Sequence, residues 1–389
     1  MKFELVATCL FGLEKLLGEE IEELGYEKTS VIDGRVSFFG DAEAVALANI
    51  KLRFAERVYI KLGGFRAESF DALFEGVRAL PWEEFIGKCD AFPVKGHSVR
   101  SALVSIPDCQ AIVKKAIVTR LSQVYGLQIF PETGVKYQVV FFLLNNEAAL
   151  MIDTSGDPLY KRGYRRETGD APIRETLAAA IAKLSRPREE VLLWDPMCGS
   201  GTIAIEAAMM MRGIAPGVRR SFAAERYPFV PEAVWNAARE EAREEEHPSA
   251  FRAYASDIDP AMLSLAEDNA RRAGVADAIK VFRADAALIR KPEGVRGTIV
   301  TNPPYGERLG SLREAEQLYR RIGGAFRAMA PWQVYVITSH PAFEKLYGRR
   351  ADKVRKLYNG MIPCYLYQYF KNDRGAEGTE KPDRRETGK

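Results

Sequence analysis

Five short apolar runs in the second half of the chain alternate with segments of helical periodicity, and this alternation is the strongest constraint on the fold. Near-continuous apolar strands that alternate with helices are typical of a parallel sheet covered by helices on both faces. The sequence therefore predicts a doubly wound α/β domain. Its expected strands are Val191–Trp194, Ala253–Ser256, Ile279–Phe282, Thr298–Val300 and Val334–Thr338.

The first half of the chain has a different pattern. Its first 60 or so residues predict the order β-α-β-β-α-β, beginning with a strand at Phe3–Thr8 and a helix at Phe11–Leu24. This order suggests a small ferredoxin-like sandwich, although any small α+β domain fits it about as well. Farther along, Pro107 opens a helix to about Tyr125, and Tyr137–Leu144 with Ala148–Asp153 forms a hairpin.

Composition narrows the class of protein. The 389 residues suffice for two or three domains, and 47% hydrophobic residues with 28% charged ones are usual for a folded protein. The net charge of +3 requires any nucleic-acid surface to be a local patch. No apolar run reaches the roughly 20 residues that cross a bilayer, and the start lacks a signal peptide's layout. We therefore expect a cytoplasmic protein with no membrane contact.

The cysteines and histidines give no sign of a metal site. The five cysteines form no CxxC pair, and the three histidines are scattered along the chain. Neither set has the spacing of metal ligands or of a disulfide framework, so we expect no metal.

A glycine-containing turn follows the first of the five predicted strands. Gly199, Gly201 and Ala204 fit the pattern G-x-G-x-x-A of dinucleotide-binding folds, so a nicotinamide oxidoreductase is one candidate. Asp195 precedes the turn, however, where an acid would repel a pyrophosphate and suits a ligand amine. The next acidic strand end, Asp257, also lies much farther along the chain than the roughly 20 residues expected for a dinucleotide fold.

Acidic residues follow two more of the predicted strands. The Asp257 carboxylate can accept both hydroxyls of a ribose, and the neighbouring Ile258 offers an apolar face to an adenine. Asp285 could accept the adenine amine or simply cap a helix. Because the carboxyl ends of parallel strands share one edge, these acids and Asp195 should line a single crevice.

The fourth strand is followed by Asn302-Pro303-Pro304-Tyr305. The Asn302 side-chain oxygen and the Pro303 carbonyl can accept the two N–H groups of an exocyclic amine and direct its lone pair to an electrophile. Consecutive prolines fix the backbone in advance, and Tyr305 can stack on a base taken out of its helix. An electrophile that combines adenine, ribose and an amino-acid amine is S-adenosylmethionine.

These blocks resemble the class I S-adenosylmethionine-dependent methyltransferases, and more closely the bacterial RNA guanine-N2 methyltransferases that carry a THUMP domain. The resemblance is specific at Asp195–Ala208, Asn302–Leu309, Lys161–Arg165 and Ala171–Leu177, and diffuse at the THUMP-like Phe92–Val94 and Val99–Ser101. It implies a Rossmann-like methyltransferase domain preceded by ferredoxin-like and THUMP α+β domains. The implied boundaries are 1–58 ferredoxin-like, 59–155 THUMP, 156–188 linker and cofactor-closing helix, 189–371 methyltransferase and 372–389 disordered tail.

The resemblance also implies roles for individual residues. The expected catalytic residues are Asn302, Pro303 and Tyr305. The expected cofactor-binding residues are Asp195, Pro196, Gly199, Gly201, Thr202, Asp257, Ile258, Asp285 and Asn302. Lys161, Arg162, Arg165 and Arg166 could hold RNA phosphates, although a solvated linker explains these four nearly as well.

The expected activity is methylation of a guanosine N2 in RNA, first of all 23S ribosomal RNA. Some ribosomal-RNA relatives carry a second methyltransferase domain, and this chain would supply only the N2 activity. Three other groups present a similar amine and are alternative substrates: a transfer-RNA guanosine, an adenine N6 and a glutamine amide. An RNA-binding assembly factor without catalysis is the alternative from another class of protein. The sequence does not define the oligomeric state.

Overall fold

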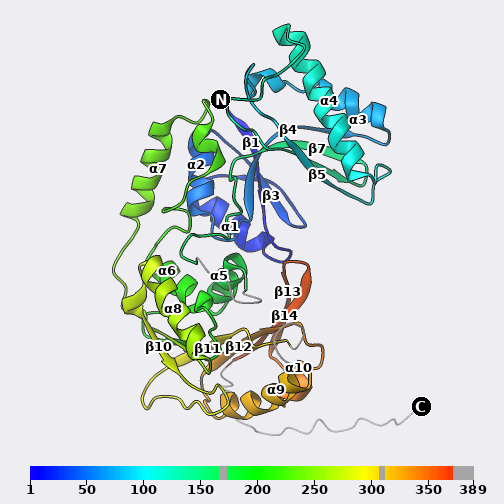
Figure 1. Cartoon of the computed structure of the whole chain (residues 1–389). Coiled ribbons are helices and arrows are strands. Elements are labelled where there is room, and N and C mark those ends of the chain that lie inside the picture. Colours follow the sequence, from blue (N-terminus) through cyan, green and yellow to red (C-terminus); the bar gives the residue numbers. More distant parts are fainter. Residues whose placement is uncertain (166–172, 306–311, 371–389) are drawn as a thin grey trace, which may run out of the picture.

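The computed structural model describes residues 1–165, 173–305 and 312–370, and within these ranges it holds two seven-stranded sheets (Figure 1). The first sheet has the strand order β2-β3-β1-β4-β7-β6-β5, and the second has the order β10-β9-β8-β11-β12-β14-β13. The expected tail, 372–389, lies outside the described residues.

The N-terminal sheet is largely antiparallel, with one parallel pair between β5 and β6. The expected β-α-β-β-α-β order is present as β1, α1, β2, β3, α2 and β4. The strands are β1 (Phe3–Thr8), β2 (Lys28–Ile32), β3 (Arg35–Gly40), β4 (Arg57–Arg66), β5 (Val94–Val99), β6 (Val139–Leu144) and β7 (Glu147–Asp153). The helices are α1 (Glu14–Glu23), α2 (Ala42–Lys51), α3 (Phe70–Arg78) and α4 (Ile106–Tyr125).

The two expected N-terminal domains share this sheet through β4. The ten-residue β4 pairs with β1 along its first half and with β7 along nearly all its length. The expected boundary between residues 58 and 59 therefore falls inside one continuous strand.

The second sheet confirms the predicted doubly wound α/β fold. All five apolar runs form strands, and β10, β9, β8, β11 and β12 are parallel neighbours, whereas β14 and β13 run antiparallel at one edge. The strands are β8 (Leu192–Asp195), β9 (Ala253–Asp257), β10 (Ile279–Arg283), β11 (Gly297–Thr301), β12 (Gln333–Thr338), β13 (Lys353–Asn359) and β14 (Ile362–Tyr369). The helices are α5 (Glu175–Leu184), α6 (Thr202–Met211), α7 (Glu232–Glu244), α8 (Pro260–Ala273), α9 (Leu312–Arg327) and α10 (Phe343–Tyr347).

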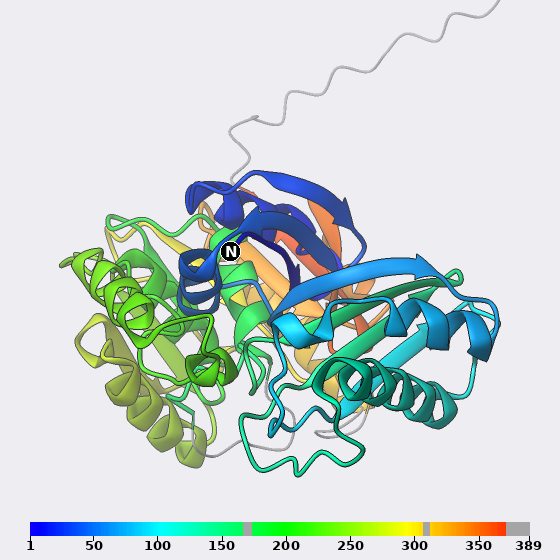
Figure 2. The ribbon, with the colours of Figure 1, turned by 90° about the horizontal axis from the view of Figure 1, so that it is seen from above.

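The two sheets are joined by one continuous core. A single cluster of buried side chains extends from β1 through α5 and α6 to β9 and β14. The insertion at 213–247 contributes α7, which packs on α2 and lies on the opposite side of the molecule from α3 and α4 (Figures 1 and 2). Lys51 at the end of α2 contacts Glu241 at 2.5 Å and Glu245 at 2.7 Å. These two acidic residues therefore fasten the insertion to the N-terminal part.

Candidate functional site

The expected site residues meet at the carboxyl ends of the parallel strands. Asp195 ends β8 and Asp257 ends β9, while Asn302 directly follows β11. Thr301 donates its hydroxyl to the Asp195 carboxylate at 2.8 Å, and the Gly199 N–H donates to the Asp257 carboxylate at 2.9 Å. These hydrogen bonds connect the end of β11 to the end of β8, and the glycine turn to the end of β9.

Gly199 and Gly201, the two glycines of the turn, have different structural roles. Gly201 has φ +80°, and a Cβ there would lie 3.1 Å from Ala266 Cβ, so this glycine allows α6 to begin close to α8. Gly199 has φ +50°, and its Cβ would point into open space with no atom within 4 Å. A residue without a side chain beside open space lets a ligand approach the backbone. The turn therefore fits a cofactor.

Burial raises the pKa of the Asp195 carboxyl to about 7, and the nearby negative charge of Asp257 also raises this pKa. Hydrogen bonds from the Thr301 hydroxyl and the Met197 N–H lower it in part. Asp195 is 1% exposed. A buried carboxylate of this kind is stabilised by a cation beside it. The ammonium group of an amino-acid ligand would supply that cation.

Asp257 and Ile258, which are expected to contact a ribose and an adenine, lie at the carboxyl end of β9. The two Asp257 oxygens each accept one N–H, from Gly199 at 2.9 Å and from Asp259 at 3.1 Å. Each carboxylate oxygen has a further lone pair for a hydroxyl. Ile258 leaves 59% of its surface exposed, which is unusual for its size and available to an apolar ring.

Asp285 lies beyond β10 and already has two partners. Its carboxylate accepts the Ala287 N–H at 2.9 Å and an Arg321 N–H at 2.7 Å, and these contacts hold its pKa below the usual value. Both of the roles weighed from the sequence, a local cap and a contact with an adenine amine, are compatible with this geometry, since Asp285 binds the Ala287 N–H and lies just beyond the carboxyl end of β10.

The segment after β11 is held by residues that the sequence did not single out. Tyr305 donates its hydroxyl to the Asn302 side-chain oxygen at 2.5 Å. The Pro304 carbonyl accepts the Tyr319 hydroxyl at 2.7 Å, and Cys364 Sγ on β14 lies 3.8 Å from the Tyr305 hydroxyl. Tyr319 and Cys364 come from distant elements, and no local pattern marks them.

Pro196 and Thr202 are both buried in this region. The Thr202 hydroxyl lies 3.3 Å from Ser200 Oγ and accepts an Arg165 N–H at 3.3 Å. Thr202 therefore fastens the glycine turn to the preceding linker, which is a different contact from the one expected with the cofactor.

The basic residues of the linker are not arranged for phosphate binding. Arg162 is buried, pairs with Glu206 at 3.6 Å and donates to the Leu159 carbonyl at 2.6 Å and to the Arg53 carbonyl. Arg165 pairs with the buried Glu175 at 3.1 Å.

The expected RNA contacts of Arg162 and Arg165 are therefore corrected, because the buried carboxylates of Glu206 and Glu175 bind these groups inside the protein. Lys161 is exposed and lies 3.6 Å from Asp157. Arg166 lies outside the described residues.

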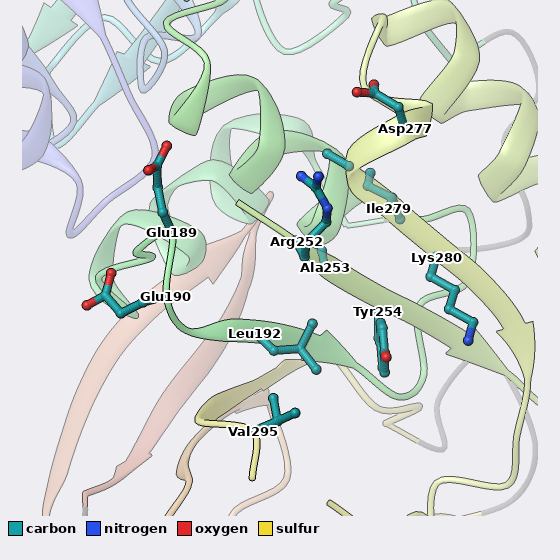
Figure 3. A pocket seen from close by; sticks show the side chains of 11 residues that line it. Glu189, Glu190, Leu192, Arg252, Ala253, Tyr254, Asp277, Ile279, Lys280 and Val295 are labelled. Atoms are coloured by element: carbon teal, nitrogen blue, oxygen red, sulfur yellow. The ribbon is translucent and has the colours of Figure 1, made fainter. Parts of the chain in front are cut away.

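A separate open groove of about 620 Å³ lies at the amino ends of the parallel strands of the second sheet (Figure 3). It is lined by the first residues of three parallel strands, Leu192, Ala253 and Ile279, together with Tyr254 and Lys280. Ligands of open α/β sheets bind beyond the carboxyl ends of the strands, so this groove is distinct from the candidate site.

The described ranges show neither a metal-binding cluster nor a membrane-spanning helix. They contain no cluster of three or more His, Cys, Asp or Glu residues that could hold a metal ion. They also contain no helix long and apolar enough to span a membrane.

The doubly wound sheet, with its glycine turn and polar residues at the carboxyl ends of the strands, is that of a class I methyltransferase, whose cofactor is S-adenosylmethionine. A family model described as the RMKL-like methyltransferase domain matches residues 162–368. Models of the RlmL ferredoxin-like domain and the THUMP domain match residues 4–59 and 67–153. The chain belongs to the family of RMKL-like methyltransferases with these two N-terminal domains.

Two curated relatives match most of the chain. The "Putative RNA methyltransferase YpsC" of Bacillus subtilis is 44% identical over 372 residues, covering 95% of this chain and 96% of the relative. The "Ribosomal RNA large subunit methyltransferase K/L" of Psychromonas ingrahamii is 36% identical over 368 residues, covering 92% of this chain. This chain spans 49% of that second relative's length.

Two solved structures share the whole architecture. One, described as a putative methyltransferase complexed with SAH, has TM-score 0.89 and 40% identity, and covers 96% of this chain and 99% of its own. Another, from Listeria monocytogenes, has TM-score 0.88 and 45% identity, and covers 95% of this chain and 96% of its own. It is described as a predicted N6-adenine-specific DNA methylase.

Proposed function

We propose that this protein transfers a methyl group from S-adenosylmethionine to the N2 amine of a guanosine in RNA, with 23S ribosomal RNA as the substrate. The observation that carries the proposal is the position of Asn302–Tyr305. This segment follows β11 directly, and its neighbour Thr301 bonds to Asp195 beside the glycine turn. An amine acceptor site and a cofactor turn therefore belong to the same crevice.

Each part of the crevice has a role in holding the cofactor. Asp195, Gly199 and Gly201 would hold its methionine end, Asp257 the ribose and Ile258 the adenine. When bound, the cofactor supplies an electrophilic methyl carbon on a sulfonium. Asp285 would accept the adenine amine beside the Arg321 guanidinium that already contacts it.

Asn302 and Pro303 would hold the substrate amine. Their two oxygens accept its two N–H groups, so that the nitrogen lone pair points away from the base plane and toward the cofactor. Positioning of this kind lowers the barrier without a strong base, and the proton leaves after transfer. In the structure the Tyr305 hydroxyl occupies the Asn302 oxygen at 2.5 Å. A substrate amine would replace that hydroxyl, and the released ring would stack on the base.

The N-terminal half and the relatives support an RNA substrate. The THUMP match covers residues 67–153, and both curated relatives are named as RNA methyltransferases. The name of the K/L relative favours large-subunit ribosomal RNA over transfer RNA. RNA is recognised at loops and bulges, where a base can leave its stack at low cost.

Adenine N6 is the second candidate. A structure 45% identical to this chain is described as a predicted N6-adenine-specific DNA methylase, and Asn302–Tyr305 would hold an adenine amine as readily. A non-catalytic RNA-binding assembly factor is a third. It requires neither the Gly199 turn nor Asn302, and absence of S-adenosylmethionine binding in calorimetry would favour it.

The deciding experiment uses total RNA from a strain that lacks this gene. The purified protein and methyl-labelled cofactor are added, and the RNA is digested to nucleosides. We expect labelled N2-methylguanosine from large-subunit RNA. Wild-type RNA, whose site is already modified, is the matched control and should take up little label. Label in N6-methyladenosine, in DNA or in transfer RNA would overturn the assignment.

A further inference from the structure

The edge of the second sheet carries a concentration of positive charge. Residues 344–356, which include most of α10 and the start of β13, are called the basic edge. They contain six Lys or Arg residues and two acidic ones, a net charge of +4 in a chain whose total is +3. The six cations are Lys345, Arg349, Arg350, Lys353, Arg355 and Lys356.

Most of these cations have no acidic partner. Within residues 1–165, 173–305 and 312–370, Arg349 alone among the six forms an ion pair, with Asp352 at 3.0 Å. Elsewhere on the molecule many basic side chains are paired, as Lys51 and Arg212 are. The local patch that a nearly neutral nucleic-acid-binding protein requires is therefore present at this edge.

Arg355 is the most informative member of the basic edge. Its side chain is half-buried, and its Nε is buried without a hydrogen-bond partner among the described residues. A buried donor without an acceptor costs free energy, so native proteins rarely leave one unpaired. Cations on an edge strand can also serve to prevent pairing with other chains. That role needs exposed charge, and it does not explain a half-buried guanidinium.

The basic edge connects the candidate site with the N-terminal sheet. Arg355 and Leu357 lie on the same face of β13, because residues two apart in a strand share a face. Leu357 pairs with Cys364, whose sulfur is 3.8 Å from the Tyr305 hydroxyl. At the far end of the strand, Tyr358 contacts Phe11 of the N-terminal part with ring centroids 5.5 Å apart.

We propose that the basic edge binds the sugar-phosphate backbone of the substrate RNA beside the target base, with phosphates accepting hydrogen bonds from the exposed Lys353 and Lys356 and from the terminal N–H groups of the half-buried Arg355. The inference rests on the proposed RNA substrate and adds the surface that the linker arginines do not supply. A strand bound here would run from the Asn302 segment toward the N-terminal sheet, so both halves of the protein would contact one RNA.

The test measures RNA affinity against salt concentration, using a transcript of large-subunit ribosomal RNA as the probe. Each lost phosphate contact lowers the log–log salt slope by about 0.7 for single strands. Between 50 and 200 mM salt, each contact thus accounts for about a 2.6-fold change in affinity, and three for about 18-fold. We expect the K353Q/R355Q/K356Q variant to lose about two units of slope.

Three further variants make the result interpretable. Lys280→Gln removes an exposed charge from the opposite edge of the sheet (Figure 3) and should leave the slope unchanged. K353Q/K356Q changes exposed positions only, so it should fold normally and lose part of the slope. Arg355→Lys keeps the charge and should retain most of the affinity that Arg355→Gln loses.

Two outcomes separate this inference from the proposed function. If the wild-type protein binds RNA with a steep salt slope and the triple variant has the same slope, the basic edge is not the RNA surface and the proposed function stands. If the wild-type protein shows no salt-dependent RNA binding, both are wrong. Calorimetric S-adenosylmethionine affinity should be equal in all variants, and a parallel loss would indicate a damaged fold and contradict a purely RNA-binding role.

Discussion

Tyr305 offers the sharpest perturbation of the candidate site, because its hydroxyl and its ring have opposite effects in the account above. The hydroxyl donates to the Asn302 oxygen at 2.5 Å, and the proposed binding mode has the substrate amine replace it there. A net hydrogen bond contributes about 0.5–1.5 kcal/mol. Tyr305→Phe removes this competitor and should raise kcat/KM by up to about 2- to 13-fold. It should not lower it.

Tyr305→Ala removes the ring as well. Stacking of a base on an aromatic side chain contributes about 1–3 kcal/mol, so this variant should lose about 5- to 160-fold in kcat/KM. The assay is the initial rate of methyl transfer against RNA concentration, with cofactor affinity measured separately by calorimetry as the control. Equal losses in both variants would refute the reasoning, because the hydroxyl itself would then be required.

Three other variants test the cofactor turn and the linker. Gly199→Ala should weaken S-adenosylmethionine binding, because its methyl group enters the open space through which a ligand would approach the backbone; unchanged affinity in calorimetry would contradict this. Wild-type cofactor affinity should rise as the pH increases through about 7, where Asp195 ionises, and Asp195→Asn should show weaker and flat binding between pH 6 and 8. The folded pKa of Asp195 lies above its unfolded value, so its contribution to stability without cofactor should fall as pH rises from about 4 to 7. Arg162→Met should lower the free energy of unfolding by about 3 kcal/mol in urea titrations, since it leaves the buried Glu206 short of a partner, and should not alter RNA affinity; weaker RNA binding with unchanged stability would restore the phosphate role.

Local sequence predicted the parts of the fold that depend on local physics. The five parallel strands could be predicted because a buried strand is apolar along most of its length. The helix at Ile106–Tyr125 could be predicted because Pro107 marks its first turn. The placement of Asp195, Asp257 and Asn302 at one crevice followed from the geometry of parallel strands.

The sequence did not predict what depends on partners far along the chain. Arg162 lies in a stretch with the composition of a solvated linker, and only the fold brings Glu206 to it. The extension of β4 into both halves of the N-terminal sheet likewise depends on β7, which lies about 90 residues later. Nothing in the local sequence around Tyr319 indicates that its hydroxyl donates to the Pro304 carbonyl.

The most direct test of the central claim is a pair of measurements on Asn302→Ala. If Asn302 holds the substrate amine while Asp195, Gly199 and Asp257 hold the cofactor, the variant should bind S-adenosylmethionine nearly as tightly as the wild type in calorimetry. In the same preparation, its single-turnover rate on RNA should fall by at least about a hundredfold, as expected when an interaction that positions the reacting atom is lost. Parallel loss of cofactor affinity and rate, or an undiminished rate, would contradict the account.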